Sequence, residues 1–367
     1  MKNILINALP MTVVGTGIGR YLRGLAGAVE AGYGGAVRLS YFVGDRVVDE
    51  PPAVRGAGWR ERLGQLLWRM PHPVGYGARL VRHAWTEKCF RHICSGYDVY
   101  HEAGYFPFKP SEKVRTVLTV HDLSLLRFPE WHPRERVCYA QRFFLERLDL
   151  VDGFCAVSEF TKREMVEHLS IDPARIIVTP LGFDNTLFNE ADDPEAQKVL
   201  VGAGMPEKFI LFVGSGDPRK KLDLALAALE KSRNPLPLVT VGWSGWSRMD
   251  APGVFNMGYV TDRVLAQLYR KAELLVMPSQ YEGFGLPVLE AMACGCPVLT
   301  SDAEALLEIG GDAVESVRDV RDADLFARRL DALCDSIAQR TLMRERGRNR
   351  AREFSWERTA RTTVGAW

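Results

Sequence analysis

One stretch of the chain, residues 281–296 (YEGFGLPVLEAMACGC), limits most strongly what the chain can fold into. The apolar run ELLVM at residues 273–277 has strand character, and Pro287 suits the first turn of a helix because its missing N–H costs nothing there. Gly295 stands where a left-handed residue often ends a helix. The segment therefore predicts a strand, a loop and a helix, and ligands of open α/β sheets bind beyond the carboxyl ends of such strands.

The predicted loop carries a carboxylate between flexible backbone positions. Gly283 and Gly285 allow the backbone to approach a ligand, and the free N–H groups of the first helical turn suit anionic or hydroxyl oxygens. Glu282 lies in the loop and Glu290 in the second helical turn, so at ~1.5 Å rise per residue their carboxylates stand on the order of 10 Å apart. That spacing is too large for two carboxylates acting on one bond, but it suits residues that hold the two ends of an extended ligand.

A second strand, loop and helix carries cations. Residues 209–214 (FILFVG) are predicted to form the strand, and Arg219 and Lys220 precede the predicted helix LDLALAALEK. Cations at a helix N-terminus oppose the helix dipole by roughly 0.3–1 kcal/mol each when they are exposed. A bound diphosphate would reverse that penalty, because both the cations and the dipole favour it.

The beginning of the chain combines an apolar strand with glycines. Residues 3–9 form the predicted strand, and Gly17 and Gly19 lie at the start of the helix behind it. The glycine spacing is similar to that of a dinucleotide-binding motif, but Arg20 stands where the last glycine is required. We therefore exclude a nicotinamide site here.

Two histidines each follow a predicted strand of the first half, His101 and His121, and Asp122 comes next. A histidine just past a buried strand lies at the carboxyl edge of the sheet, where ligands bind. A lone histidine is more often structural, so both interpretations stay open, and the functional one is favoured for His121.

Length and charge restrict the class of protein. The 367 residues suffice for two domains of ordinary size, and the polar segment 189–204 contains the expected boundary. Lys and Arg number 47 against 46 Asp and Glu, so no global charge points to nucleic acid. The seven cysteines include no CxxC pair, which favours a reduced cytosolic protein over a disulfide framework. With no signal peptide and no run of transmembrane length, we expect a cytoplasmic protein, peripheral at most on the inner face of the cytoplasmic membrane.

Residues 59–93 differ from the rest of the chain in composition. They hold seven Arg and Lys against Glu61 and Glu87, interleaved with tryptophan, leucine and phenylalanine, and Pro71 and Pro73 divide them into two predicted helices. A cationic amphipathic stretch can lie on an anionic membrane surface. The equally open alternative is a pair of helices packed on the sheet with a solvated basic face.

The spacing of Glu282 and Glu290, E-x7-E within EGFGLPVLEAMACGCPV, resembles the signature of retaining GT-B glycosyltransferases. The string most resembles bacterial mannosyltransferase-like enzymes of surface-polysaccharide assembly. The resemblance implies an α/β fold of two doubly wound Rossmann-like domains that face each other across a cleft. Residues 1–188 would form the acceptor-side domain and residues 189–350 the nucleotide-sugar domain, and a terminal helix within residues 351–367 would return to the first domain.

The resemblance also implies roles for residues of this sequence. Arg219 and Lys220 would hold the donor diphosphate, and Glu282 would bind the sugar hydroxyls. Glu290 would bind the ribose, and His121 would position the sugar. The implied catalytic residues are His121, Arg219, Lys220 and Glu282. The implied donor-binding residues are Gly17, Gly19, Gly214, Ser215, Arg219, Lys220, Glu282, Gly283, Phe284, Gly285, Leu286 and Glu290, and the implied acceptor-side residues are Arg20, His101 and Asp122. Ser215 departs from the pattern, since many relatives carry an arginine there, and this shifts more of the phosphate contact to Arg219.

The implied reaction is the retaining transfer of a hexose, best taken as mannose from GDP-mannose, to a hydroxyl of a glycan or lipid-linked glycan. GDP-rhamnose, UDP-hexoses and dTDP-sugars are the alternative donors. No cofactor and no metal are expected, because no Asp-x-Asp motif lies in the expected cleft loops. Two other functions remain open: a sugar-nucleotide epimerase of the same fold, and a non-catalytic protein that binds a sugar-nucleotide.

Overall fold

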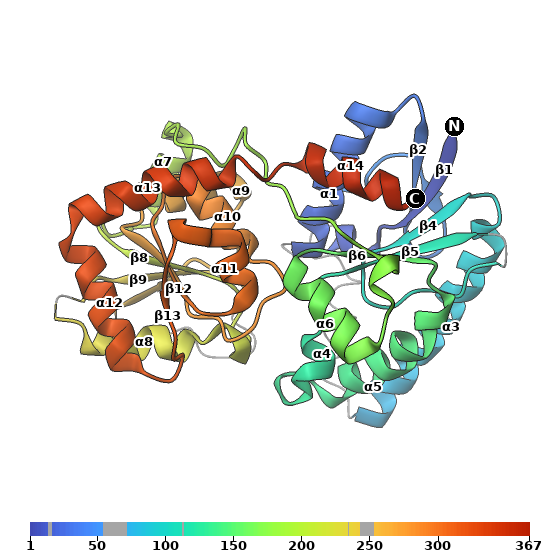
Figure 1. The fold of residues 1–367 in the computed structure, drawn as a ribbon, viewed down its shortest axis with the longest axis horizontal. Coiled ribbons are helices and arrows are strands. Elements are labelled where there is room, and N and C mark those ends of the chain that lie inside the picture. The colour runs from blue at the N-terminus through green and yellow to red at the C-terminus, as the bar shows by residue number, and fades with distance from the viewer. Residues whose placement is uncertain (14–16, 54–71, 112–113, 234, 243–252) are drawn as a thin grey trace. The chain divides into compact units, whose positions relative to one another are not determined.

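The computed structural model describes residues 1–13, 17–53, 72–111, 114–233, 235–242 and 253–367. The chain forms two compact units (Figure 1): unit 1 comprises Met1–Gly182 and Trp356–Trp367, and unit 2 comprises Phe183–Ser355. The first junction lies slightly before the expected boundary at residues 188 and 189. One reason is that Phe188 packs against Tyr269 of unit 2, with ring centroids 6.2 Å apart.

Unit 1 is built on a sheet whose described strands lie in the order β3-β2-β1-β4-β5-β6-β7. Every pairing is parallel except that of β2 with β3. The strands are β1 (Lys2–Asn7), β2 (Val37–Phe42), β3 (Val47–Val48), β4 (Val99–Glu102), β5 (Arg115–Val120), β6 (Gly153–Ala156) and β7 (Ile176–Val178). The chain winds outward in both directions from β1 and β4, as in a doubly wound fold.

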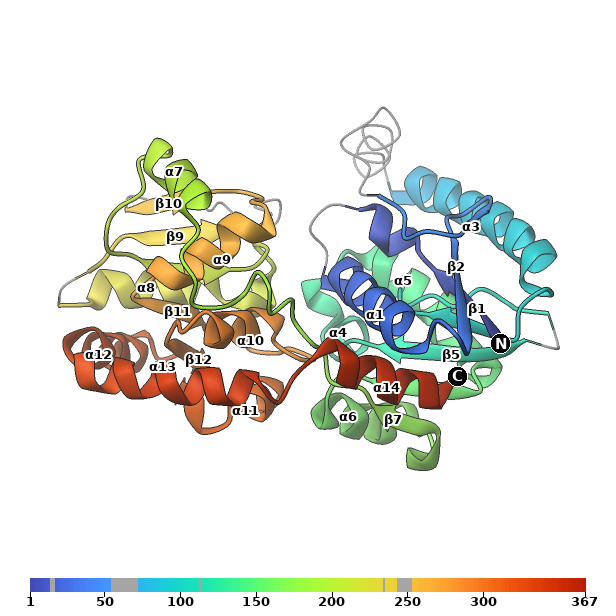
Figure 2. The ribbon, with the colours of Figure 1, turned by 90° about the horizontal axis from the view of Figure 1, so that it is seen from above.

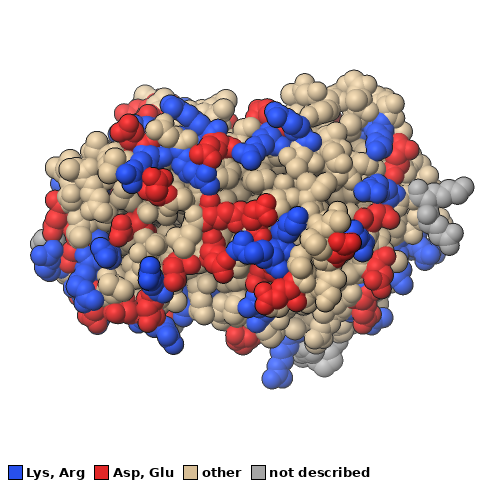
Figure 3. Space-filling view, viewed as in Figure 1, with Lys and Arg blue, Asp and Glu red and all other residues tan. Residues whose placement is uncertain are grey.

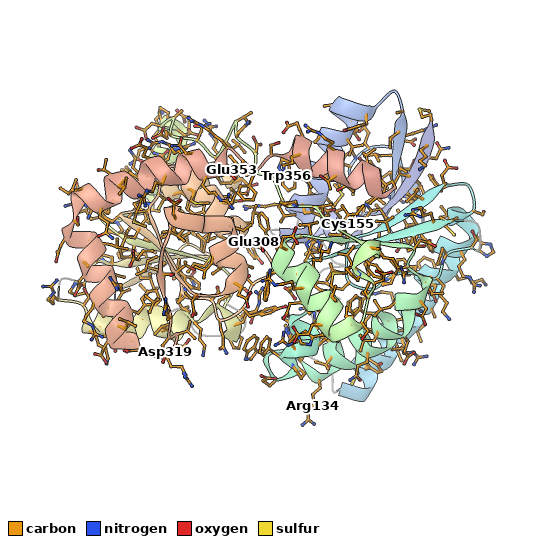
Figure 4. The ribbon with its side chains drawn as sticks, in the orientation of Figure 1. Arg134, Cys155, Glu308, Asp319, Glu353 and Trp356 are labelled. Carbon is orange, nitrogen blue, oxygen red and sulfur yellow. The ribbon has the colours of Figure 1, made fainter. Side chains whose placement is uncertain are left out.

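Helices cover both faces of this sheet (Figures 1 and 2). The described helices of unit 1 are α1 (Gly17–Tyr33), α3 (His72–Cys94), α4 (Ser124–Arg127), α5 (Arg134–Phe143), α6 (Glu159–Leu169) and α14 (Trp356–Ala366). On one face α1 packs against α14, the terminal helix that returns to unit 1 as expected. Trp356, at the start of α14 (Figure 4), fills the space beside Gly24, where a Cβ would lie 2.1 Å from its ring.

Unit 2 repeats the arrangement with an all-parallel sheet in the order β10-β9-β8-β11-β12-β13. The strands are β8 (Ile210–Val213), β9 (Leu238–Val241), β10 (Val254–Asn256), β11 (Leu274–Met277), β12 (Val298–Ser301) and β13 (Glu315–Val317). The described helices are α7 (Pro194–Gly202), α8 (Leu222–Lys231), α9 (Asp262–Lys271), α10 (Leu286–Ala293), α11 (Glu304–Gly310), α12 (Ala323–Asp335) and α13 (Ile337–Ala351). One face of the sheet packs against α8 and α12 in a continuous apolar core, and α9 and α10 lie on the other face (Figure 1).

Each sheet has a switch point, where two neighbouring strands send the chain in opposite directions. In unit 1 the pair is β1 and β4, and in unit 2 it is β8 and β11. Because the loops that leave such a pair diverge, they open a crevice at the carboxyl edge, where α/β sheets bind ligands. The two predicted loops of unit 2 leave the sheet at its switch point.

Candidate functional site

The loop from β11 to α10 has the geometry that the sequence predicts. Pro287 lies in the first turn of α10, and Gly295 follows the helix with a φ of 70°. Gly285 precedes the helix with a φ of 106°, and a Cβ there would lie 2.6 Å from Leu306. Glycine is therefore required at Gly285 both by the left-handed backbone and by the packing.

The helix after β8 begins at Leu222, as predicted. Residues Pro218–Lys220 before it form a separate 3-10 turn, and Lys221 joins the two with a φ of 53°. Asp217 caps the turn, because its Oδ1 accepts the backbone N–H of Arg219 at 3.1 Å. Its Oδ2 lies 3.3 Å from Arg219 Nε. Asp217, for which the sequence indicated no role, therefore orients Arg219 through both backbone and side chain.

The two loops meet through charged side chains. Arg219 Nη1 donates to Glu282 Oε2 at 2.7 Å and to the Tyr281 carbonyl at 3.0 Å. Lys220 Nζ donates to Glu282 Oε1. The backbone N–H of Gln280 donates to the Arg219 carbonyl at 2.8 Å, which joins the loops a second time. Glu282 thus bridges both cations at the switch point of β8 and β11.

This arrangement corrects one expectation. Arg219 and Lys220 are predicted to oppose the helix dipole until a diphosphate binds. In the structure Glu282 already balances both cations, and α8 begins after them as predicted. The long-range pairing was missed because it joins residues 62 and 63 positions apart in the sequence.

Burial makes this cluster electrostatically strong. Lys220 and Glu282 are 9% and 6% exposed. Burial alone would raise the pKa of the Glu282 carboxyl, but Arg219 and Lys220 outweigh it and hold that pKa below its usual value. Burial lowers the pKa of Lys220, and the Glu282 carboxylate opposes that shift. Glu282 is therefore an ionised acceptor at neutral pH.

Glu290 faces a different environment from Glu282. It is 2% exposed in the second turn of α10, and its Oε2 accepts the hydroxyl of Tyr269 from α9 at 3.2 Å. The two carboxylates therefore have separate partners. Tyr269 is a further residue that the sequence did not single out.

The remaining candidates of unit 2 lie in or beside the two loops that meet at this cluster. Gly214 and Ser215 follow β8, and Gly242 passes so close that a Cβ on it would lie 2.2 Å from the Gly214 carbonyl oxygen. Gly283 and Phe284 are buried in the β11 loop, and Leu286 opens α10 half-buried; the ring of Phe284 packs edge-on against Phe354. These contacts explain the fold of the loops, and a ligand role for them stays a prediction.

His121 lies at the carboxyl end of β5 in unit 1. Its Nε2 lies 3.1 Å from the Ala103 carbonyl oxygen. Because a carbonyl only accepts, Nε2 carries the proton and Nδ1 is left as an acceptor. Burial lowers the pKa of His121 to about 4, against the opposing effect of Asp122, so the ring is neutral. The Tyr21 ring packs edge-on against it at 5.1 Å.

His101, an expected acceptor-side residue, has its partners inside unit 1. It is fully buried, its Nδ1 accepts the indole N–H of Trp367 at 2.8 Å, and its Nε2 lies 2.8 Å from Thr119 Oγ1. Both ring nitrogens are used inside unit 1, and burial lowers the pKa of His101 to about 3. It therefore holds the end of α14 against the sheet.

Asp122 and the residues at the start of α1 have local structural roles. Asp122 Oδ1 accepts the backbone N–H and the hydroxyl of Ser124 at 2.9 and 2.7 Å, which starts α4. Gly17, Gly19 and Arg20 lie in the first turn of α1, as the predicted helix start requires. The donor-binding role of Gly17 and Gly19 and the acceptor-side role of Arg20 and Asp122 stay predictions.

Among the described residues, no group of three or more His, Cys, Asp or Glu side chains could hold a metal ion. In the same part of the chain, no helix is long and apolar enough to cross a membrane. All seven cysteines are free thiols.

Basic and acidic side chains intermingle on the face that Figure 3 shows, without one continuous basic stripe. This agrees with the near-zero formal net charge of +1. Of the basic stretch 59–93, residues 59–71 lie outside the described residues, and the rest belongs to α3.

Two family models match the chain. The glycosyl transferases group 1 model matches residues 195–350, and the glycosyltransferase family 4 model matches residues 15–187. The chain is 31% identical over 381 residues to the O-antigen chain mannosyltransferase B of Escherichia coli, covering 96% of each chain. It is 28% identical to the serotype-specific mannosyltransferase WbdA of Escherichia coli, over 72% of this chain and 35% of that protein.

Solved structures share the fold. WaaG, a glycosyltransferase involved in lipopolysaccharide biosynthesis, superposes with a TM-score of 0.68 at 16% identity, covering 99% of this chain and 98% of that chain. At this identity the likeness concerns the fold alone, and it agrees with two doubly wound units.

Proposed function

The chain belongs to the group 1 glycosyltransferases with the GT-B fold, and from this premise we propose that it moves mannose from GDP-mannose to a glycan or lipid-linked glycan hydroxyl. The transfer retains the configuration at the sugar carbon and serves surface-polysaccharide or lipopolysaccharide assembly. The observation that carries the proposal is the buried cluster of Arg219, Lys220 and Glu282 at the switch point of unit 2. Mannose is chosen because two relatives are named mannosyltransferases.

The cluster suits a leaving diphosphate. Arg219 and Lys220 are fixed in place by Asp217, Tyr281 and Glu282 before any ligand arrives. Fixed cations stabilise the negative charge that grows on the diphosphate as the bond to the sugar carbon breaks. The acceptor oxygen forms the new bond on the same face, and its proton passes to a diphosphate oxygen. In this scheme the cations take the role that a metal ion has in other transferases, so no metal is needed.

Two further residues would hold the sugar and the nucleoside. A diphosphate that replaces Glu282 on the cations releases its carboxylate, which can then accept hydrogen bonds from sugar hydroxyls. Glu290, held by Tyr269, would accept the two ribose hydroxyls. Nδ1 of His121 is suited to accept a hydrogen bond from a sugar hydroxyl, because Nε2 carries the ring proton.

The charge state of Glu282 disfavours an epimerase. An epimerase needs a carboxyl that can donate a proton to the sugar, but Arg219 and Lys220 hold the pKa of Glu282 below its usual value. A non-catalytic binding protein would have no need of a buried, preorganised cluster. Measuring consumption of the donor with and without acceptor separates the three functions.

We also propose a peripheral membrane site on α3. Val81 is 72% exposed and Trp85 is 54% exposed one turn later, and Lys88 continues the same side of the helix. Glu87, the acid of this helix, is turned inward and pairs with Arg147. An exposed side with an indole and cations suits an anionic lipid surface, where each basic residue adds about 1 kcal/mol.

Some residues of the basic stretch 59–93 pack inside unit 1. Arg79 pairs with Glu135, and Phe90 is fully buried in the core of unit 1. The appropriate variant therefore replaces the exposed Arg82, Lys88 and Arg91 by glutamate and leaves Arg79 intact. Sedimentation with anionic and neutral vesicles should recover wild type only on anionic lipid at low salt, and lose the variant. Equal recovery of both proteins would leave only a solvated basic face.

The donor is identified most directly by thermal shift. A nucleoside diphosphate or its sugar that binds the folded protein raises its unfolding temperature by mass action. GDP and GDP-mannose should give the largest shift, ahead of UDP and dTDP compounds. A larger shift with a uridine or thymidine compound would refute the choice of guanosine, and no shift with any of them would refute all of these donors.

A further inference from the structure

Glu102 is a buried carboxylate at the switch point of unit 1, and nothing in the proposed reaction uses it. It ends β4, next to β1, and the register pairs Ile6 with His101. Glu102 is 0% exposed. The loops that follow β1 and β4 diverge at this place, where doubly wound sheets bind ligands.

The carboxylate joins those two loops. Its Oε2 accepts the side-chain N–H of Asn7 at 2.7 Å and the hydroxyl of Tyr100. Its Oε1 accepts the backbone N–H of Gly104. Asn7 Oδ1 in turn accepts the backbone N–H of Leu9 at 3.2 Å. Glu102 therefore holds the first residues of both loops in one hydrogen-bonded group.

The loop after β4 contacts His121. Ala103 lies between Glu102 and Gly104, and its carbonyl oxygen accepts a hydrogen bond from His121 Nε2, with the two atoms 3.1 Å apart. Gly104 lies on the carboxylate so closely that a Cβ would stand 2.9 Å from Glu102 Oε1. Tyr105 follows with a φ of 73°, and its ring lies 6.4 Å from that of His121. The position of the Ala103 carbonyl is thus set by Glu102.

We propose that Glu102 is a positioning residue: its carboxylate holds the loop 103–105 so that the Ala103 carbonyl keeps the proton of His121 on Nε2. Nδ1 then remains the acceptor that the sugar meets, and this last step alone rests on the proposed function. Burial raises the pKa of Glu102 to about 7, against the lowering effect of its hydrogen-bond donors. A buried carboxylate is unfavourable compared with an apolar side chain of the same volume, so packing does not account for it.

Two variants test this role. In Glu102→Gln the amide –NH2 must face a donor, either Gly104 N–H on one side or Asn7 and Tyr100 on the other. Tyr100→Phe removes one donor from the carboxylate and keeps the ring. Asp331→Asn is the matched control, because Asp331 is a buried carboxylate of unit 2 that accepts from Ser232.

The readout is the imidazole ¹⁵N spectrum of His121, assigned with a His121→Asn variant, in the full chain without substrate at a pH well above 7, where Glu102 is ionised. Wild type and Asp331→Asn should show the proton on Nε2. Glu102→Gln should show a mixture of tautomers, and Tyr100→Phe a smaller change in the same direction. If Glu102→Gln does not fold, Tyr100→Phe alone decides. Unchanged His121 signals in the folded variants would overturn the proposal.

Kinetics separate this inference from the function on which it rests. Glu102→Gln should lower kcat by about 10²-fold, as misplacement of a positioning group does, while the affinity for GDP stays that of wild type. If wild type shows no transfer at all, the tautomer result still stands on its own. If transfer occurs and the kcat of the folded Glu102→Gln variant is unchanged, Glu102 is only structural.

Discussion

Replacing Glu282 by glutamine should tighten the binding of nucleoside diphosphate while it abolishes sugar transfer. In the ligand-free protein, the Glu282 carboxylate accepts a hydrogen bond from Arg219 at 2.7 Å and another from Lys220. A diphosphate must displace this carboxylate before it can reach the same cations. Glutamine keeps the size of the side chain and removes the competing charge.

The magnitude follows from the contacts that are exchanged. Hydrogen bonds to charged groups contribute about 1.5–3 kcal/mol each, and wild type must break two of them to admit the diphosphate. If half of that cost is recovered when the released Glu282 meets solvent or sugar, the variant gains about 1.5–3 kcal/mol. This corresponds to roughly 10- to 100-fold tighter binding of GDP.

The same substitution should destabilise the ligand-free protein. It leaves Lys220 and Arg219 largely buried without their main counter-charge, and breaking a buried pair costs about 3–5 kcal/mol. Asp217, 3.3 Å from Arg219, retains part of the balance, so we expect the lower end of that range. The variant should therefore gain more thermal stability from GDP than wild type gains.

Calorimetric titration with GDP and thermal unfolding with and without GDP measure both effects. Asp331→Asn is the control, since Asp331 is a buried carboxylate of unit 2 that accepts from Ser232 and has no part in the proposed donor site. A folded Glu282→Gln variant that binds GDP no better than wild type would show that the carboxylate and the diphosphate do not compete.

The remaining predictions concern the same site and the end of the chain. Arg219→Ala and Lys220→Ala should each lower kcat by roughly 10²–10³-fold, and near wild-type turnover would place the phosphate site elsewhere. Glu290→Ala should weaken GDP binding itself, whereas an unchanged GDP affinity would remove it from the ribose site. Transfer should survive chelation of divalent metals, and dependence on added metal would contradict the fixed-cation mechanism. Trp367→Phe should lower the free energy of unfolding by about 1–3 kcal/mol in urea, because His101 Nδ1 loses its donor. Because the pKa of His101 falls from 6.5 to about 3 on folding, its contribution to stability is complete above pH 6.5 and is lost as the pH falls toward 3.

Local sequence signals determined the elements that carry the site. Pro287 and Gly295 marked the start and end of α10, and the structure has both in the expected geometry. These signals are readable because caps, prolines and left-handed glycines act within a few residues of the chain. The resemblance carried by residues 281–296 implied two doubly wound units, and the structure has them.

Only the tertiary structure decided which charges meet. The sequence did not predict that Glu282 pairs with Arg219 and Lys220, which come from the loop of a neighbouring strand. Nor did it predict that Trp367, 266 residues later, donates to His101. No signal within the sequence reveals such pairs, because they depend on strand order and on the face that each side chain takes. The same reason hid Glu102, whose partner Asn7 becomes a neighbour only when β1 and β4 pair in register.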